Sequence, residues 1–280
     1  MLTAQAMRAL PRIVGRTPET EALFACLDAG RHVLLEGPVG VGKTVLASAV
    51  SHALGRGMVR VDGDGRYTEA KLVGSFDPPA VLATGYRPES FLPGPLVRAM
   101  RDGAVLFVNE LNRMPEGVQN VLLPAMDEGH LHVPNLGDVR AATGFAVIAT
   151  QNPAEFVATG ALSEALLDRF ELVRLDHQSE EDERAIVTKD ARTAPSVEIV
   201  AQAVALVRAT RDDPRIRRGA SVRAAVAIAD IANRLDDDVT RAAALALPTR
   251  IELVDAQGTP MSLLLDDLKK KVTPRSPPST

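Results

Sequence analysis

The sequence predicts an α/β protein in which a parallel sheet flanked by helices is followed by a small all-helical domain. Up to about residue 175, short apolar segments alternate with segments of helical periodicity, which is typical of β–α–β units in a parallel sheet. From Ser179 onward we find helical patterns only. We therefore expect a first domain over residues 1–177, a helical domain over 178–256 and a C-terminal extension over 257–280 whose last residues are disordered.

The elements of the first domain can be assigned in order along the chain. Thr17 and Pro18 are typical of a helix start, and Gly30 is typical of its end. After this helix we expect strands over 32–36, 58–61, 104–108, 145–150 and 172–175, and helices over 43–54, 95–101 and 115–127. Pro124 should kink or shorten the last of these helices, because proline lacks the N–H that a helix interior needs.

The second domain is predicted from four segments of helical periodicity. These segments cover 180–191, 197–210, 221–235 and 239–247. A charged stretch over residues 211–218 separates the second helix from the third.

The composition favours a soluble protein and argues against several classes of partner. The 280 residues are 46% hydrophobic and 24% charged, which is enough apolar side chain for a sizeable core. No apolar run approaches the ~18 residues of a membrane span, and the first residues lack a signal-peptide core, so we expect a cytoplasmic protein without a membrane partner. A net charge of −4 and an aromatic content of 3% argue against nucleic acid as a partner.

A glycine-rich loop between the first expected strand and the helix after it is the strongest functional signal. It reads GPVGVGKT and fits the pattern G-x-x-x-x-G-K-[ST]. The glycines let backbone N–H groups face phosphate oxygens at a helix N-terminus, Lys43 would reach the β- and γ-phosphates, and Thr44 would bind Mg²⁺. The predicted phosphate-binding residues are Gly37, Pro38, Val39, Gly40, Val41, Gly42, Lys43 and Thr44.

A second signal is the pair Asn109 and Glu110 at the end of the apolar strand 104–108. Nucleoside triphosphatases with such a loop use polar residues at the end of an apolar strand to hold the Mg²⁺ hydration shell and to polarise the attacking water. Glu110 suits the role of base. Asn109 stands where an aspartate is usual, so it can accept a hydrogen bond from a metal-bound water but carries no charge. A buried strand with a polar end is the alternative interpretation, and the glycine-rich loop some 65 residues earlier favours the catalytic one.

Three further polar residues are candidates for catalytic contacts near the γ-phosphate. Asn152 follows the strand 145–150 and would face the crevice at the carboxyl ends of the strands, although an Asn-Pro pair is also typical of a plain turn. Arg169 becomes functional only if a neighbouring subunit delivers it as an arginine finger. Arg223 starts a helix of the second domain and could point back at the nucleotide, or it could be an exposed helix residue.

With these motifs in this order, the chain resembles the MoxR family of AAA+ ATPases. The similar segments are VGR at 14–16, LLEG at 34–37, LPGP at 92–95, NELNR at 109–113, ATQNP at 149–153, LSEA at 162–165, LDRF at 167–170, GASVR at 219–223 and PTRI at 248–251. The chain departs from the family pattern at Asn109, at Val222, where proline is usual, and at Pro124.

The resemblance implies an AAA+ core with a C-terminal helical lid, ATP and Mg²⁺ as cofactors, and a homo-hexameric ring in which Arg169 reaches the neighbour's ATP. Members of the family act as chaperone-like remodellers in maturation or metal-cofactor insertion, often with a von Willebrand factor A domain protein and a client enzyme as partners. An ATP-hydrolysing remodeller is therefore the leading hypothesis, with hydrolysis attenuated by Asn109 as an open question. A nucleotide-gated assembly factor that binds ATP with little hydrolysis is the alternative, and a P-loop phosphotransferase for a small molecule is a third.

Overall fold

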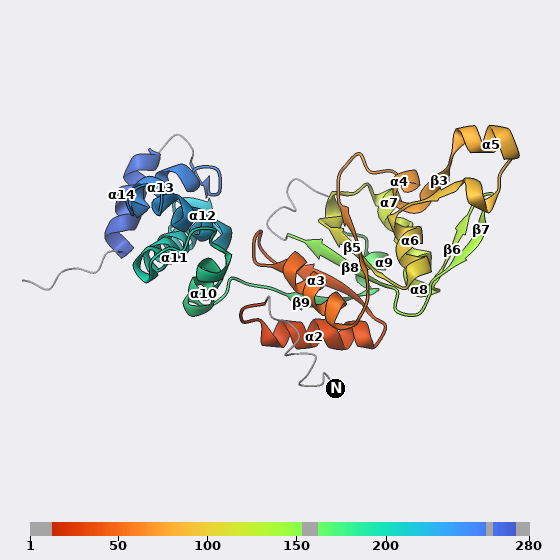
Figure 1. The fold of residues 1–280 in the computed structure, drawn as a ribbon, viewed down its shortest axis with the longest axis horizontal. Helices are drawn as coiled ribbons and strands as arrows, with labels where there is room; N and C mark the ends of the chain where they lie inside the picture. The colour runs from red at the N-terminus through yellow and green to blue at the C-terminus, as the bar shows by residue number, and fades with distance from the viewer. Residues whose placement is uncertain (1–12, 153–161, 256–259, 273–280) are drawn as a thin grey trace, which may run out of the picture. The chain divides into compact units, whose positions relative to one another are not determined.

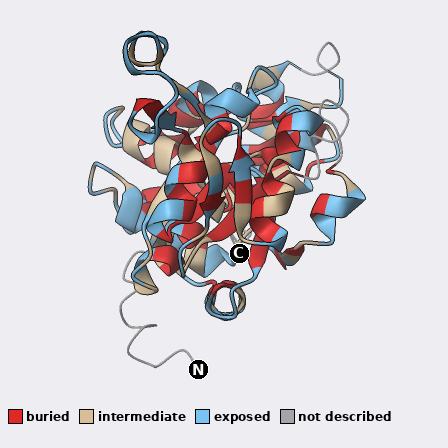
Figure 2. Ribbon diagram, turned by 90° about the vertical axis from the view of Figure 1, so that its right-hand side faces the viewer, coloured by how far each residue is buried: buried red, intermediate tan, exposed pale blue. Residues whose placement is uncertain are grey.

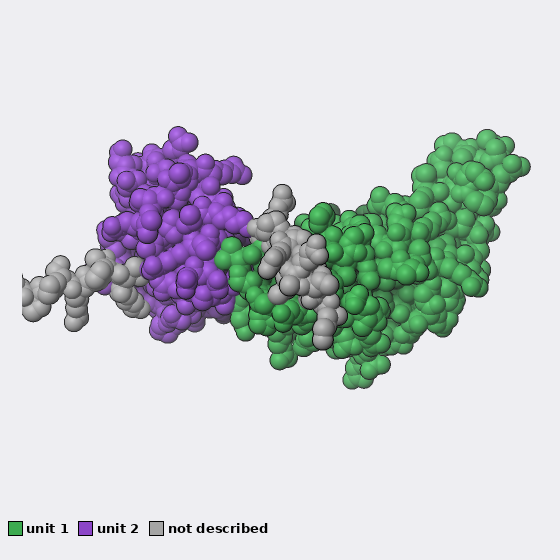
Figure 3. Space-filling view, turned by 60° about the horizontal axis from the view of Figure 1, so that its bottom comes forward, with its two compact units in different colours: residues 1–38, 42–176 green, residues 39–41, 177–280 purple. Residues whose placement is uncertain are grey.

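The computed structural model describes residues 13–152, 162–255 and 260–272. The contacts within the chain divide it into two compact units, which are residues 1–38 with 42–176, and residues 39–41 with 177–280 (Figure 3). Within the described ranges, none of the helices has both the length and the apolar character that a membrane crossing requires.

A parallel sheet forms the centre of the first unit (Figure 1). Its five strands run in the order β2-β5-β8-β1-β9, and all four pairings between neighbours are parallel. The strands are β1 (His32–Glu36), β2 (Met58–Asp62), β5 (Val105–Asn109), β8 (Ala146–Gln151) and β9 (Phe170–Arg174). This arrangement confirms the α/β prediction, and each observed strand overlaps the apolar segment that predicted it.

Three helices, α2 (Thr17–Asp28), α3 (Lys43–Ala53) and α6 (Pro95–Asp102), pack on this sheet (Figure 1). The shorter helices α4 (Glu69–Val73), α7 (Glu116–Asn120), α8 (Leu122–Asp127) and α9 (Glu164–Leu167) add buried apolar residues to the same core. In Figure 2 the buried residues follow the strands and one side of the helices, which is the pattern of amphipathic helices on an apolar sheet.

Pro124 has the predicted effect on the helix expected over residues 115–127. The structure contains two short helices there, α7 and α8, which meet at Val121. A proline at 124 cannot donate a hydrogen bond to the carbonyl of Asn120, and its ring crowds that carbonyl. The regular helix therefore breaks just before the turn that contains the proline.

Two antiparallel hairpins extend the first unit. One pairs β6 (His130–Val133) with β7 (Gly137–Arg140). The other pairs β3 (Gly74–Phe76) with β4 (Phe91–Pro93) and carries α5 (Pro78–Thr84) and the 3₁₀ turn η1 (Pro88–Ser90) between its strands. This second hairpin therefore spans residues 74–93.

The second unit is a bundle of helices with a buried aliphatic core rich in alanine. The helices are α10 (Glu180–Asp190), α11 (Val197–Asp212), α12 (Val222–Ala232), α13 (Val239–Ala246) and α14 (Met261–Val272). The first four match the predicted segments. The fifth was not predicted and lies in the expected C-terminal extension, while residues 273–280, where disorder was predicted, lie outside the described residues.

The second unit also contains a short antiparallel ribbon that the helical patterns did not predict. Its strands are β10 (Ile216–Arg218) and β11 (Glu252–Leu253), with Ile216 opposite Leu253. Strands of two or three residues are too short to show an alternating pattern, so only the tertiary pairing reveals them. The expectation of helices is confirmed, but the unit is not purely helical.

Candidate functional site: a phosphate-binding loop at the carboxyl edge of the sheet

Three of the predicted motifs meet at one edge of the sheet because of the strand order. The glycine-rich loop follows β1, Glu110 follows β5 and Asn152 follows β8, and β8 lies between the other two strands. All three strands are parallel, so their carboxyl ends lie at the same edge. In open α/β sheets this edge is where ligands bind.

The backbone of the glycine-rich loop takes conformations that require glycine. A Cβ on Gly37 would lie 2.0 Å from the carbonyl oxygen of Leu175, so only glycine fits between β1 and the chain that follows β9. Gly42 has φ +96° and caps the start of α3. Lys43 is the first residue of that helix, and its Nζ donates to the carbonyl oxygens of Gly37 at 2.5 Å and Pro38 at 2.9 Å. The loop therefore curls around its own lysine and leads into a helix N-terminus, the geometry that binds phosphate.

Glu110 is held in a strained backbone conformation at the end of β5. Its φ is +57°, which is unusual for a residue with a side chain and is often found at functional sites. Its N–H donates to the hydroxyl of Thr150 at 2.8 Å, and its carboxylate forms an ion pair with the Nε of Arg113 at 3.0 Å. A Cβ on Gly63 would lie 2.1 Å from the carbonyl oxygen of Glu110, so the chain after β2 packs directly on this residue.

Asn109 is fixed by hydrogen bonds at both ends of its amide. Its Nδ2 donates to Oδ1 of Asp62 at 3.0 Å, and its Oδ1 accepts from the hydroxyl of Thr150 at 3.1 Å. Asp62 lies opposite Asn109 in the register of β2 and β5, and its hydrogen bonds with Arg60, then with Asn109, lower its pKa. An aspartate at 109 would place a second carboxylate against Asp62. The uncharged amide of Asn109 avoids this repulsion and donates a hydrogen bond instead.

Asp62 and Thr150 are parts of the site that were not predicted from the sequence. Asp62 is the last residue of β2, and Thr150 is a fully buried residue of β8. A signal for both was available, because each polar residue stands at or near the end of an apolar segment predicted as a strand. What the sequence did not contain is the strand order, which makes both strands neighbours of β5.

Asn152 is buried at the carboxyl end of β8, with 4% of its surface exposed. Its neighbour Gln151 donates to the carboxylate of Glu36 at 2.7 Å, and Arg174 of β9 donates to the other oxygen of that carboxylate at 3.2 Å. These bonds cross-link the ends of β8, β1 and β9 beside the glycine-rich loop. Asn152 therefore directly follows a strand end that these bonds fix.

Arg169 is not brought to this edge. It immediately precedes Phe170, which pairs with His32 at the beginning of β1, whereas the glycine-rich loop follows the end of that strand. From its first to its last residue, a strand of this length rises about 13 Å. Arg169 instead forms an ion pair with Asp127 at 2.5 Å and donates to the carbonyl oxygen of Ala165.

Arg223 belongs to the second unit, where it lies exposed in the first turn of α12. Its predicted role at the nucleotide stays a prediction. Among the described residues, no group of three or more His, Cys, Asp and Glu could hold a metal ion. Thr44 and Asn109 offer one hydroxyl and one amide oxygen, a donor set that suits Mg²⁺ bound mainly by phosphate oxygens and water.

The fold and this site define the class: a P-loop nucleotide-binding protein of the AAA+ type. A family model described as the AAA domain of the dynein-related subfamily matches residues 32–170. The gas vesicle ATPase GvpN2 of Halobacterium salinarum is 31% identical over 236 residues, covering 78% of this chain and 67% of that protein. The gas vesicle ATPase GvpN of Haloferax mediterranei is 32% identical over 75% of this chain and 65% of its own length. The chain thus spans about two thirds of these relatives.

Two solved structures show the same fold at low sequence identity. A candidate ATPase from Cytophaga hutchinsonii has a TM-score of 0.55 and 21% identity, covering 96% of this chain and 93% of its own. A variant of RuvB from Thermotoga maritima has a TM-score of 0.55 and 18% identity, covering 84% of this chain and 70% of its own. The chain belongs to the dynein-related AAA ATPases, and its motifs place it with the MoxR family among them.

Proposed function

We propose that the protein binds ATP with Mg²⁺ at the loop 37–44 and hydrolyses it to ADP and phosphate. The observation that carries this proposal is the common sheet edge at which the loop, Glu110 and Asn152 lie. A phosphate-binding loop beside a carboxylate and a buried amide supplies the three parts that phosphoryl transfer to water needs: a cradle, a base and a group that orients the water.

Each residue then has a defined task. The N–H groups of the loop and Lys43 bind the phosphates, while Thr44 and Asn109 would hold Mg²⁺, which neutralises charge on the phosphate oxygens. Glu110 takes the proton of the attacking water, and Asn152 orients that water. One oxygen of the Glu110 carboxylate is paired with Arg113 in the structure, so we propose that the other oxygen accepts the water.

We further propose that hydrolysis drives a chaperone-like remodelling of a client protein in the cytoplasm. In this proposal the chain forms a homo-hexamer, residues 178–256 act as a lid that carries Arg223, and Arg169 completes the neighbouring subunit's site. A von Willebrand factor A domain protein and a client enzyme are the proposed partners. Support comes from the family resemblance and from the position of Arg169, which lies at the opposite edge of the sheet from its own loop.

The first test of the proposal is nucleotide binding and turnover by the intact chain. The chain has no tryptophan, so binding is measured with a fluorescent ATP analogue, and turnover is measured as phosphate release. We expect both activities to require Mg²⁺ and to be lost in Lys43→Ala, because the loop then lacks its ammonium group. Binding without Mg²⁺-dependent phosphate release would favour the nucleotide-gated assembly factor.

The hydrogen bond between Asn109 and Asp62 supports that alternative and leads to a specific prediction. Asn109→Asp alone is expected not to raise hydrolysis, because the new carboxylate would face that of Asp62. The double variant Asp62→Asn with Asn109→Asp keeps one charge and one hydrogen bond and moves the charge to the site. We expect it to raise the rate of phosphate release about tenfold, equivalent to roughly 1.4 kcal/mol of transition-state stabilisation.

Asp62→Asn alone is the control for this pair, since it removes the charge of Asp62 without adding a charge at 109. If the double variant releases phosphate no faster than the wild type, Asn109 does not attenuate the site. If Asn109→Asp alone raises the rate as much as the double variant, Asp62 does not oppose a charge at 109.

A further inference from the structure

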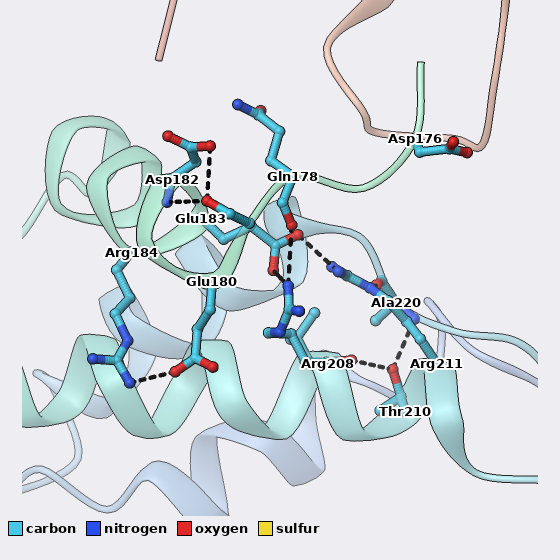
Figure 4. A network of polar contacts seen from close by, with 12 residues as sticks. Asp176, Gln178, Glu180, Asp182, Glu183, Arg184, Arg208, Thr210, Arg211 and Ala220 are labelled. Carbon is cyan, nitrogen blue, oxygen red and sulfur yellow. Dashed lines mark hydrogen bonds and ion pairs between the residues drawn. The ribbon is translucent and has the colours of Figure 1, made fainter. Parts of the chain in front are cut away.

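A buried carboxylate organises one end of the second unit (Figure 4). Glu183 lies on α10, and only 3% of its side chain is exposed. It accepts hydrogen bonds from the Nη1 atoms of two arginines on α11, Arg211 at 2.7 Å and Arg208 at 3.3 Å. A buried ion pair of this kind contributes little net stability, but removing one partner leaves an uncompensated charge, so such pairs fix geometry.

Arg211 links Glu183 to the loop before α12. Its Nε donates to the carbonyl oxygen of Ala220 at 2.8 Å, while its Nη1 is held by Glu183. The N–H of Ala220 donates to the hydroxyl of Thr210 at 2.9 Å, so α11 binds both backbone groups of this residue. Arg211 is thus a rigid bridge, because its planar guanidinium fixes two contacts at once.

The residue before Ala220 packs equally closely on α11. A Cβ on Gly219 would lie 2.7 Å from Cγ and 2.8 Å from Cα of Arg211, so only glycine allows this approach. The helix α12 begins at Val222, two residues after Ala220, and Arg223 lies in its first turn. The loop that α11 fixes therefore determines the position of the first turn of α12, which contains Arg223.

We propose that Arg211 is a positioning residue for Arg223. Glu183 orients Arg211, Arg211 fixes the backbone at Gly219 and Ala220, and this backbone fixes the first turn of α12. The inference rests on the proposed function, because it gives Arg223 its role at the nucleotide. Arg211 holds the backbone before Arg223 in place in the nucleotide-free protein, so that less conformational entropy is lost when nucleotide binds.

The structural part of the proposal is tested by hydrogen exchange on the nucleotide-free protein. Arg211→Met keeps most of the side chain's length and removes its donors. We expect the amides of residues 219–223 to exchange about tenfold faster in this variant, because a charge-assisted bond to the loop is lost. Arg208→Met is the matched control, since Arg208 also binds Glu183 but donates to the carbonyl oxygen of Gln178 rather than to this loop. It should leave exchange at 219–223 unchanged.

The functional part is tested by a double-mutant cycle on binding of the fluorescent ATP analogue. If Arg211 acts through Arg223, Arg211→Met weakens binding less than or as much as Arg223→Ala, and the double variant binds no more weakly than Arg223→Ala alone. Arg211→Lys keeps the charge against Glu183 but cannot hold both contacts, so it should lie between wild type and Arg211→Met. Arg211→Lys also replaces Arg211→Met in both experiments if Arg211→Met does not fold.

Two results would overturn the positioning role: unchanged exchange at 219–223 in both Arg211 variants, or losses in binding that add fully in the double variant. A failure of the proposed function looks different. If the wild type does not bind ATP, or if Arg223→Ala binds as the wild type does, the role of Arg223 at the nucleotide is wrong. Faster exchange in the Arg211 variants would still support the contact with the loop.

Discussion

Glu110→Gln is expected to bind ATP as the wild type does and to release phosphate at least about 100-fold more slowly. The glutamine keeps the size of the side chain but cannot take a proton from the attacking water, and general-base catalysis contributes about 10²–10⁴-fold. Binding should persist because the loop and Lys43, the proposed phosphate-binding groups, are unchanged. The measurements are the affinity for a fluorescent ATP analogue and the steady-state rate of phosphate release.

Glu116→Gln is the matched control for this prediction. Glu116 is an exposed residue at the start of α7, six positions further along the chain, so the same substitution there removes a charge without touching the site. We expect it to leave both measurements unchanged. Hydrolysis by Glu110→Gln at the parent rate would show that Glu110 is not the base.

Arg169→Ala is expected to abolish hydrolysis, by about 10³-fold or more, and to leave ATP binding nearly unchanged. An arginine finger stabilises the charge of the transition state and contributes little to the ground state, and its removal costs about 10³–10⁵-fold. The position of Arg169 at the amino end of β9 excludes a direct role at its own loop, so the loss is expected only in an assembly. Arg184→Ala, which removes an exposed arginine of α10, is the control.

Mixing two inactive variants tests whether Arg169 acts in the neighbouring subunit. An Arg169→Ala subunit retains Glu110, and a Glu110→Gln subunit retains Arg169, so one of the mixed interfaces contains both groups. We therefore expect equal amounts of the two variants to recover part of the wild-type phosphate release, while each variant alone stays inactive. If no activity returns although the mixed subunits assemble, Arg169 does not act in trans.

The ion pair between Arg169 and Asp127 bears on how that arginine is held before assembly. Asp127 raises the pKa of Arg169 through a hydrogen bond, and Ala165 accepts a second one. The Nε of Arg169 is buried and meets no acceptor among the described residues. The side chain is therefore held within its own chain, so as an arginine finger it would have to exchange Asp127 for the neighbour's phosphate.

The local motifs were readable from the sequence because their chemistry depends on neighbours along the chain. The loop 37–44 needs glycines, a lysine and a hydroxyl at fixed spacing, and its place between a strand and a helix follows from the apolar pattern on each side. Glu110 and Asn152 were found for the same reason, since each directly follows an apolar segment. The ribbon of β10 and β11 could not be found this way, because its two strands are short and distant in the chain.

The sequence by itself determined the α/β class, the glycine-rich loop and the polar residues that follow the apolar strands, because local spacing and apolar periodicity specify all three. The tertiary structure decided which strands are neighbours, and with them the pairing of Asn109 with Asp62 and the distance of Arg169 from its own loop. It also decided that Glu183 and Arg211 hold the loop before Arg223. Asn109 and Asp62 are 47 positions apart, and Glu183 and Arg211 are 28 positions apart. Arg169 and its own loop lie at opposite ends of the paired strands β9 and β1. Only the packing of the chain brings such groups together or keeps them apart.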